Sequence, residues 1–304
     1  MTAILRAGEP LGAPCMVRHI NIGTLWSLPA WSSAPPDLTS QLIDLTRCGV
    51  VALQLPRPEL VAGGALPVIG QARVLHESHA RRVAKEHRRL GCAATTLHVG
   101  TGFEGDKEMD RLVESVIDAS LDEDYPLFVE THRATITQDM KRTLDLVERL
   151  PAIRFNADLS HWYTGQEMTY GDLQAKFDAL IPIFERVRYM HGRIGTPCCA
   201  QVGLTGPHDD RGFVDDFREM WRRCASGFLK TAQPGEILPF APELLPHSMS
   251  FPGGSHYFYY ARTLDINSIE TEETDRWEQA AFLWQIAEAS AQAAGLALGR
   301  HPAL

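Results

Sequence analysis

The sequence predicts an α/β protein folded as a (β/α)₈ TIM barrel, and two observations lead to this fold class. Short β-like runs alternate with amphipathic helical segments along nearly all of the 304 residues, which indicates a parallel sheet. Connections from helix to strand are short, whereas those from strand to helix are long. Enlarged loops at the carboxyl ends of the strands are typical of a barrel. We therefore expect one domain over residues 1–304, with a barrel core at about 16–295.

Seven strands are expected where β-branched and other apolar residues gather in short runs, as in VVALQLP at 50–56. In chain order they lie at 16–23, 50–56, 93–100, 127–132, 153–161, 187–195 and 237–245. The eighth strand has two candidates, 198–204 and 255–261.

The helices between these strands are expected from apolar residues at helical spacing. Ile136, Met140, Leu144 and Val147 form one such stripe. Similar stripes lie at 173–184, 214–228 and 277–287. These faces are expected to pack against the sheet. The long loops that follow the strands are expected at 57–78, 162–171, 196–211 and 246–271.

Composition and charge restrict the class of protein. Hydrophobic residues make up 44% and charged residues 22%, which excludes a disordered chain, a collagen and a coiled coil. The net charge of −9 is not typical of a nucleic-acid-binding protein. No stretch approaches the roughly 20 apolar residues of a membrane span, and the N-terminal residues do not resemble a secretory signal. We expect a cytoplasmic protein with a small-molecule substrate and without nucleic-acid or membrane partners; homo-oligomerisation stays open.

The six cysteines are scattered and form no CxxC pair, which argues against a zinc knuckle or a thioredoxin-like site. Free thiols are consistent with a reducing cytoplasm. Cys198 and Cys199 are interpreted either as a reactive pair or as ordinary loop cysteines.

Polar residues at the carboxyl ends of four successive strands are the main indication of function. They are Glu130, Asp158, His191 and Glu243. Taken singly, each has an ordinary alternative as a helix cap, a salt-bridge partner or a core histidine. Together they would place three carboxylates in one low-dielectric mouth, where they would repel one another unless a cation neutralised them. We therefore expect one divalent ion, Mn²⁺, Mg²⁺ or Co²⁺, with Zn²⁺ also compatible.

The order strand-end Glu, Asp-x-x-His, His and Glu resembles the xylose isomerase-like TIM-barrel superfamily. The segment 128–161 is most similar to its sugar phosphate isomerase/epimerase branch, and the resemblance extends over about 17–295. It implies that Glu130, Asp158, His191 and Glu243 bind the metal. It also implies that Glu130 and Glu243 move a proton on opposite faces of a substrate carbon, and that His161 contacts a substrate oxygen.

This resemblance and the chemistry of the residues predict a metal-dependent isomerase or epimerase of a small polyhydroxylated carbonyl compound, acting in carbohydrate metabolism. A metal-polarised carbonyl makes the adjacent C–H acidic, and a nearby carboxylate can then remove the proton. One alternative is a dehydratase or hydrolase at the same metal, with endonuclease IV-like cleavage less favoured in so acidic a chain. A barrel that only binds a ligand is the other.

Further substrate contacts are expected from Arg193, His98, Arg133 and Trp162. His98 has core packing as its alternative, and so has His19, whereas Arg133 has a surface salt bridge. The aromatic run at 257–260 is interpreted as a wall of the cleft, a lid or an oligomer interface. Two features depart from the family pattern. Arg193 follows His191 by only two residues, and there is an insertion around 196–207.

Overall fold

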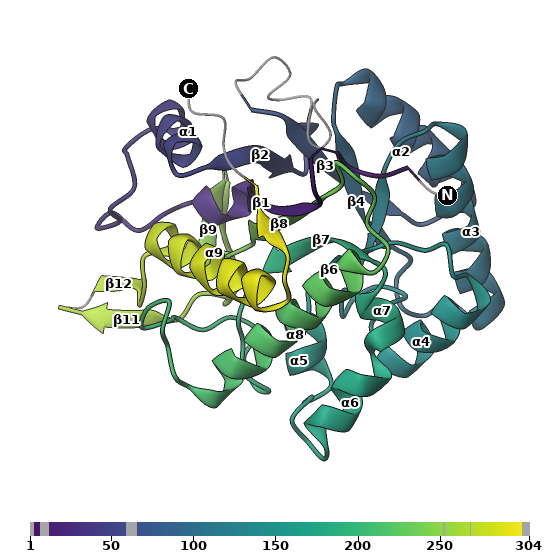
Figure 1. Cartoon of the computed structure of the whole chain (residues 1–304). Helices are drawn as coiled ribbons and strands as arrows, with labels where there is room; N and C mark the ends of the chain where they lie inside the picture. The colour runs from purple at the N-terminus through teal and green to yellow at the C-terminus, as the bar shows by residue number, and fades with distance from the viewer. Residues whose placement is uncertain (1–2, 7–11, 59–65, 252, 268, 300–304) are drawn as a thin grey trace.

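The strands of the barrel form one parallel sheet that closes on itself. The computed structural model describes residues 3–6, 12–58, 66–251, 253–267 and 269–299. The sheet closes because β1 pairs with both β2 and β8, and the central strands in Figure 1 follow one another around the ring in chain order. The strands are β1 (Cys15–Asn21), β2 (Val50–Leu55), β3 (Val68–Val74), β4 (Ala94–Val99), β5 (Leu127–Glu130), β6 (Phe155–Ala157), β7 (Val187–Gly192) and β8 (Ile237–Pro242). The predicted (β/α)₈ fold class is confirmed.

All seven predicted strands overlap barrel strands, but the prediction of the remaining one is wrong. The missing strand is β3, which lies inside the segment 57–78 that was expected to be a loop. Neither candidate belongs to the barrel, because 198–204 contains no strand and 255–261 overlaps a separate hairpin. Gly70 is one reason why β3 lacks the apolar pattern of a strand. A larger residue does not fit at this position, since a Cβ there would lie 2.2 Å from His87 Nδ1. The described residues between β2 and β3 include no α-helix.

Helices surround the strands, as Figure 1 shows. They are α1 (Leu38–Arg47), α2 (Glu77–Arg89), α3 (Asp106–Asp122), α4 (Met140–Arg149), α5 (Ser160–Gly165), α6 (Leu173–Ala179), α7 (Ile181–Phe184), α8 (Gly212–Leu229) and α9 (Arg276–Ala293), with a 3₁₀ turn η1 (Ile22–Leu25). The stripe at 173–184 is divided into α6 and α7 because Pro182, which has no backbone N–H, lies in the first turn of α7. None of the described helices is long and apolar enough to cross a membrane.

The hydrophobic core has two parts. The larger part lies between the sheet and the helices and includes Phe217 and Trp221 of α8. The smaller part includes Ile69, Phe128 and Tyr189 from the barrel strands.

The carboxyl ends of the strands carry the larger loops, as predicted for 196–211 and 246–271, whereas the predicted loop 162–171 begins inside the short helix α5. The loop 246–271 forms two antiparallel hairpins. Strand β9 (Ser248–Phe251) pairs with β10 (Gly254–Tyr257), and β11 (Thr263–Ile266) pairs with β12 (Ile269–Glu272). At the end of the described chain, β13 (Ala297–Leu298) pairs with the start of β1.

Arg276 joins the start of α9 to the turn after β1, and its replacement by Met is expected to destabilise the fold. Its guanidinium is buried, pairs with Glu272 at 2.8 Å and donates to backbone carbonyls, including Thr24 O at 2.6 Å. Met would leave a buried carboxylate and several carbonyls without partners, so we expect a loss of about 3 kcal/mol in urea unfolding. The control is the exposed Arg82→Met on α2. A loss no larger than that of the control would contradict this role.

Candidate metal centre

The four predicted ligands meet in the mouth of the barrel. Glu130 is the last residue of β5 and His191 lies in β7, while Asp158 and Glu243 directly follow β6 and β8. One ligand atom from each lies within 4.8 Å of the others. The side chain of Glu243 is 13% exposed, whereas those of Glu130 and His191 are at most 1% exposed. The cluster is therefore open to the mouth mainly at Glu243.

Each carboxylate of the cluster is oriented by neighbouring side chains. His191 Nδ1 lies 3.2 Å from Glu243 Oε2 and 3.5 Å from Glu130 Oε2. The Asp158 carboxylate pairs with the guanidinium of Arg193. Its Oδ1 also accepts hydrogen bonds from the backbone N–H and the hydroxyl of Ser160 at the start of α5. The ligand from β6 is therefore held in place before any ion binds.

Three buried amide side chains that the sequence analysis missed surround the cluster. Asn21 donates to Gln54 Oε1 at 3.0 Å and to Glu243 Oε1 at 2.9 Å. Gln54 Oε1 lies 2.7 Å from His191 Nε2, and Asn156 donates to Glu130 Oε2 at 3.0 Å. The sequence did contain one indication of these amides, since Gln54 is the one polar residue in the apolar run VVALQLP.

The charges of the cluster balance only in part. Burial lowers the pKa of His191, but the carboxylates of Glu243 and Glu130 outweigh it and raise this pKa to about 9. Burial raises the pKa of Glu243, yet His191 and Arg193 outweigh it and hold this pKa well below its usual range. Without an ion, three carboxylates thus face two cations, His191 and Arg193. A donor set of three carboxylates and one imidazole fits a hard or borderline divalent ion.

The affinity for a divalent ion is expected to rise with pH. His191 must lose its proton to bind a metal through Nδ1, and its pKa of about 9 means that it is protonated at neutral pH. We expect Mn²⁺ affinity in wild-type protein to increase about tenfold per pH unit up to about pH 8.5, measured by isothermal titration. The same His191 pKa, raised from 6.5, gives the metal-free protein stability that is complete below about pH 6.5 and lost as pH rises through about 9. An equally steep rise in His191→Gln would contradict this assignment.

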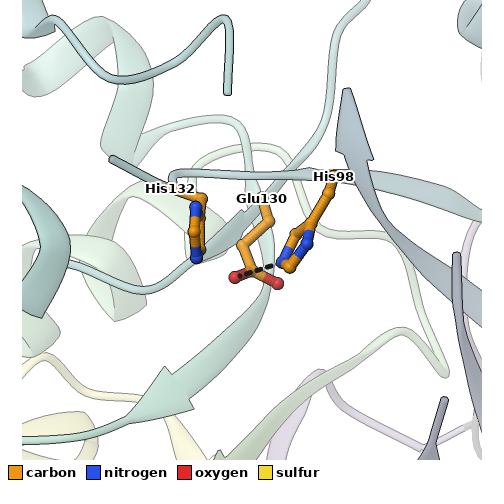
Figure 2. Close-up of side chains that lie close together, drawn as sticks. All are labelled: His98, Glu130 and His132. Atoms are coloured by element: carbon orange, nitrogen blue, oxygen red, sulfur yellow. Dashed lines mark hydrogen bonds and ion pairs between the residues drawn. The ribbon is translucent and has the colours of Figure 1, made fainter. Parts of the chain in front are cut away.

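A second group of possible ligands shares Glu130. His98 Nε2 lies 3.0 Å from Glu130 Oε1, and the charge of Glu130 raises the pKa of His98. Figure 2 shows the Glu130 carboxylate between the imidazoles of His98 and His132. The rings of His98 and His132 have centroids 4.5 Å apart, and those of His132 and His161 are 3.9 Å apart. Three imidazoles therefore form a row beside Glu130.

Hydrogen bonds determine which nitrogen of two of these rings carries the proton. Nδ1 of His132 accepts the backbone N–H of Ala134 at 3.0 Å, so its Nε2 carries the hydrogen. Burial lowers the pKa of His132 to about 3, and the ring is neutral. In His161, Nε2 accepts from Arg193 at 3.0 Å, because a guanidinium can only donate. Nδ1 of His161 therefore carries the hydrogen, and this buried atom has no partner among the described residues.

The other predicted contact residues lie at different depths. Arg193 is buried, and its guanidinium donates to Asp158 and Ser160. Because Arg193 follows His191 by only two residues, it reaches Asp158, one of the predicted metal ligands. Arg133 is exposed at the rim. Trp162 lies in the core and donates its indole N–H to Thr137 O at 2.6 Å, so its polar atom is used within the protein; its contact with substrate stays a prediction.

Two further groups of candidate residues lie outside the cluster. His19 lies 3.2 Å from the Tyr189 hydroxyl, and burial lowers its pKa to about 3. In the aromatic run, Tyr257 and Tyr259 stack on each other and are exposed, whereas Tyr260 reaches Arg193. All six cysteines, including Cys198 and Cys199, are free thiols.

Comparison with known proteins supports the fold and leaves the activity to be proposed. No protein-family model matches the sequence, and no curated protein sequence matches it either. A xylose isomerase-like TIM barrel protein from Mycobacterium smegmatis, solved in complex with magnesium, is similar over 93% of this chain and 98% of its own, with 11% identity and a TM-score of 0.53. At this identity the similarity shows a shared TIM-barrel fold.

Two other solved structures are less similar. The probable 3-DHS dehydratase AsbF of Bacillus anthracis, involved in petrobactin synthesis, has 10% identity over 76% of this chain and 94% of its own, with a TM-score of 0.45. Endonuclease IV of Thermus thermophilus has 15% identity over 77% of this chain and 94% of its own, with a TM-score of 0.42. Because these values are low, we draw no conclusion about activity from either.

Proposed function

We propose that the protein is a divalent-metal-dependent isomerase or epimerase of a small polyhydroxylated carbonyl compound, a sugar or a sugar-like molecule. The observation that carries this proposal is the placement of two glutamates in one cluster whose donor atoms suit a metal ion. Glu130 comes from the end of β5 and Glu243 from the end of β8, with Asp158 and His191 between them in chain order. A molecule seated on the cluster would therefore have a carboxylate on either side.

The residues have distinct tasks in such a reaction. A bound divalent ion would polarise a carbonyl and its neighbouring hydroxyl. Glu243, the most exposed carboxylate of the cluster, accepts the proton as the adjacent C–H bond breaks, and the electron pair moves toward the carbonyl oxygen. Glu130, once protonated from solvent, then delivers its proton to the same carbon from the other face in an epimerase, and exchange with solvent resets both glutamates. In an isomerase the proton goes to the neighbouring carbon, and the hydroxyl proton passes to the former carbonyl oxygen. Asp158 and His191 would hold the ion, and the predicted contacts His161 and His98 would hold substrate oxygens.

A dehydratase or hydrolase that uses the same ion is the second candidate. The magnesium bound to the Mycobacterium smegmatis protein supports a metal in this fold, but it does not distinguish these reactions. A barrel that only binds its ligand is disfavoured by the completeness of the cluster, since all four ligand positions carry donors.

Exchange of substrate hydrogen with solvent tests the proposal. Protein loaded with Mn²⁺, Mg²⁺ or Co²⁺ would be incubated with a panel of aldoses, ketoses and their phosphates in D₂O, and the products followed by mass spectrometry and by NMR after chelation of the metal. We expect deuterium at a carbon next to the carbonyl, together with an isomer or epimer, and no exchange after chelation. Loss of water without recovery of an isomer would favour the dehydratase, and failure of the protein to bind any divalent ion would reject both.

A further inference from the structure

One side of the mouth carries a cation without a carboxylate partner. Arg133 follows β5 by three residues and is exposed at the rim. Among the residues that the structure describes, no carboxylate lies within 4.0 Å of its guanidinium, so the alternative of a surface salt bridge is not formed. Its contact is with Tyr260, whose hydroxyl lies 3.4 Å from Nη2 and whose ring centroid lies 5.8 Å from the guanidinium carbon.

Tyr260 connects this cation to the metal cluster. The guanidinium carbon of Arg193 lies 5.1 Å from the centroid of the same ring, so Tyr260 contacts both arginines. Arg193 is already paired with Asp158, whereas Arg133 is free to bind a ligand. Arg133 directly follows His132 in the chain, and the ring centroids of His132 and His161 are 3.9 Å apart. Arg133 therefore lies close to the row of imidazoles at the mouth.

The neighbouring groups are hydrogen-bond donors. The Nε2–H of His132 has no hydrogen-bond partner among the described residues. The Nδ1–H of the adjacent His161 is likewise unpaired. A neutral imidazole with one free N–H, a guanidinium and a phenol together form a set that suits the oxygens of an anion.

The charge at the rim points the same way. Arg193 is paired with Asp158, whereas no carboxylate pairs with Arg133 among the described residues. Arg133 therefore places one unpaired positive charge at the mouth of a protein whose net charge is −9. A substrate with an anionic group would neutralise this charge, whereas a neutral sugar would not.

We propose that Arg133, with the Nε2–H of His132 and the hydroxyl of Tyr260, binds a carboxylate or a phosphate of the substrate. This rests on the proposed function in that the opposite end of the same molecule lies on the metal. The substrate is therefore an anionic polyhydroxylated carbonyl compound, such as a sugar acid or a sugar phosphate, and Arg133 determines this preference.

The test is equilibrium binding to the full chain loaded with Mn²⁺, measured by isothermal titration. The probes are glycerol, D-glycerate and glycerol 3-phosphate, which differ in carrying no charge, a carboxylate or a phosphate. We expect one anionic probe to bind wild-type protein about 10- to 100-fold more tightly than glycerol, the range of one or two charged hydrogen bonds. The anionic probe that binds more tightly shows whether the site prefers a carboxylate or a phosphate. Arg133→Met should abolish the preference, Arg133→Lys should keep part of it, and the control Arg82→Met should leave it unchanged.

Two results would overturn the proposal. Either both anionic probes bind wild-type protein no better than glycerol, or their advantage persists in Arg133→Met, which would mean that the metal alone holds the anion. Tyr260→Phe, which keeps the ring and removes the hydroxyl, should weaken the preference by a smaller factor. Since binding and not turnover is measured, a protein that shows the preference but interconverts no sugar would reject the proposed function and leave this site standing.

Discussion

Replacement of Glu243 by Gln is expected to lower turnover about 10²- to 10⁴-fold while a divalent ion stays bound. Gln keeps an oxygen ligand and the hydrogen bond that Asn21 donates to the Oε1 position at 2.9 Å, but it cannot accept a proton. Turnover would be measured with the substrate found by the deuterium-exchange screen, and the metal content by mass spectrometry on the same sample.

The control for this variant is Glu273→Gln, which changes a carboxylate paired with Arg262 outside the cluster. It should retain both turnover and metal. Full turnover in Glu243→Gln with the ion bound would show that the proton-transfer assignment is wrong. Loss of the ion together with turnover would instead assign Glu243 to metal binding, and solvent exchange would then be measured at saturating Mn²⁺.

Replacement of Arg193 by Met is expected to cost the metal-free protein about 3–5 kcal/mol of unfolding free energy. The Arg193 side chain is 1% exposed, and its loss leaves the Asp158 carboxylate buried without its cation. It also removes the donors to Ser160 Oγ at 2.9 Å and to His161 Nε2 at 3.0 Å. Urea unfolding with and without saturating Mn²⁺ would measure the effect.

The metal should restore part of this loss, because a divalent ion beside Asp158 supplies the missing positive charge. Arg188→Met is the matched control. Arg188 lies at the other end of β7 and pairs with Glu236 at 3.0 Å, where its side chain is 5% exposed. It should destabilise the protein comparably, with no greater recovery on adding Mn²⁺ than in wild type. If Mn²⁺ restored the same unfolding free energy in both variants, Arg193 would not be part of the metal cluster.

The fold could be predicted from periodicity, but one strand could not. Strands such as β2 and β8 are runs of apolar residues with few interruptions, because both of their faces are covered. In β3 the run is broken by Gly70, Gln71 and Arg73. Gly70 is explained only by a helix packed over it, since His87 of α2 occupies the space that a Cβ would need.

The sequence analysis predicted the charged residues of the candidate site but missed the neutral amide side chains around them. A carboxylate at the end of an apolar strand is conspicuous, which is why Glu130, Asp158 and Glu243 could be recognised. An amide such as Asn156 inside a strand gives no comparable signal. Its role is visible only when the strands close and its side chain meets Glu130 at 3.0 Å.

By itself, the sequence determined which chemical groups stand at the carboxyl ends of the strands, because strand and helix periods are local properties of the chain. Whether those groups meet depended on ring closure, in which β1 pairs with β8 across more than two hundred residues. Only the tertiary structure decided that Arg193 pairs with Asp158 while Arg133 has no such partner among the described residues. The physical reason is that the two arginines have the same chemistry, and the local sequence does not contain the distances that distinguish them.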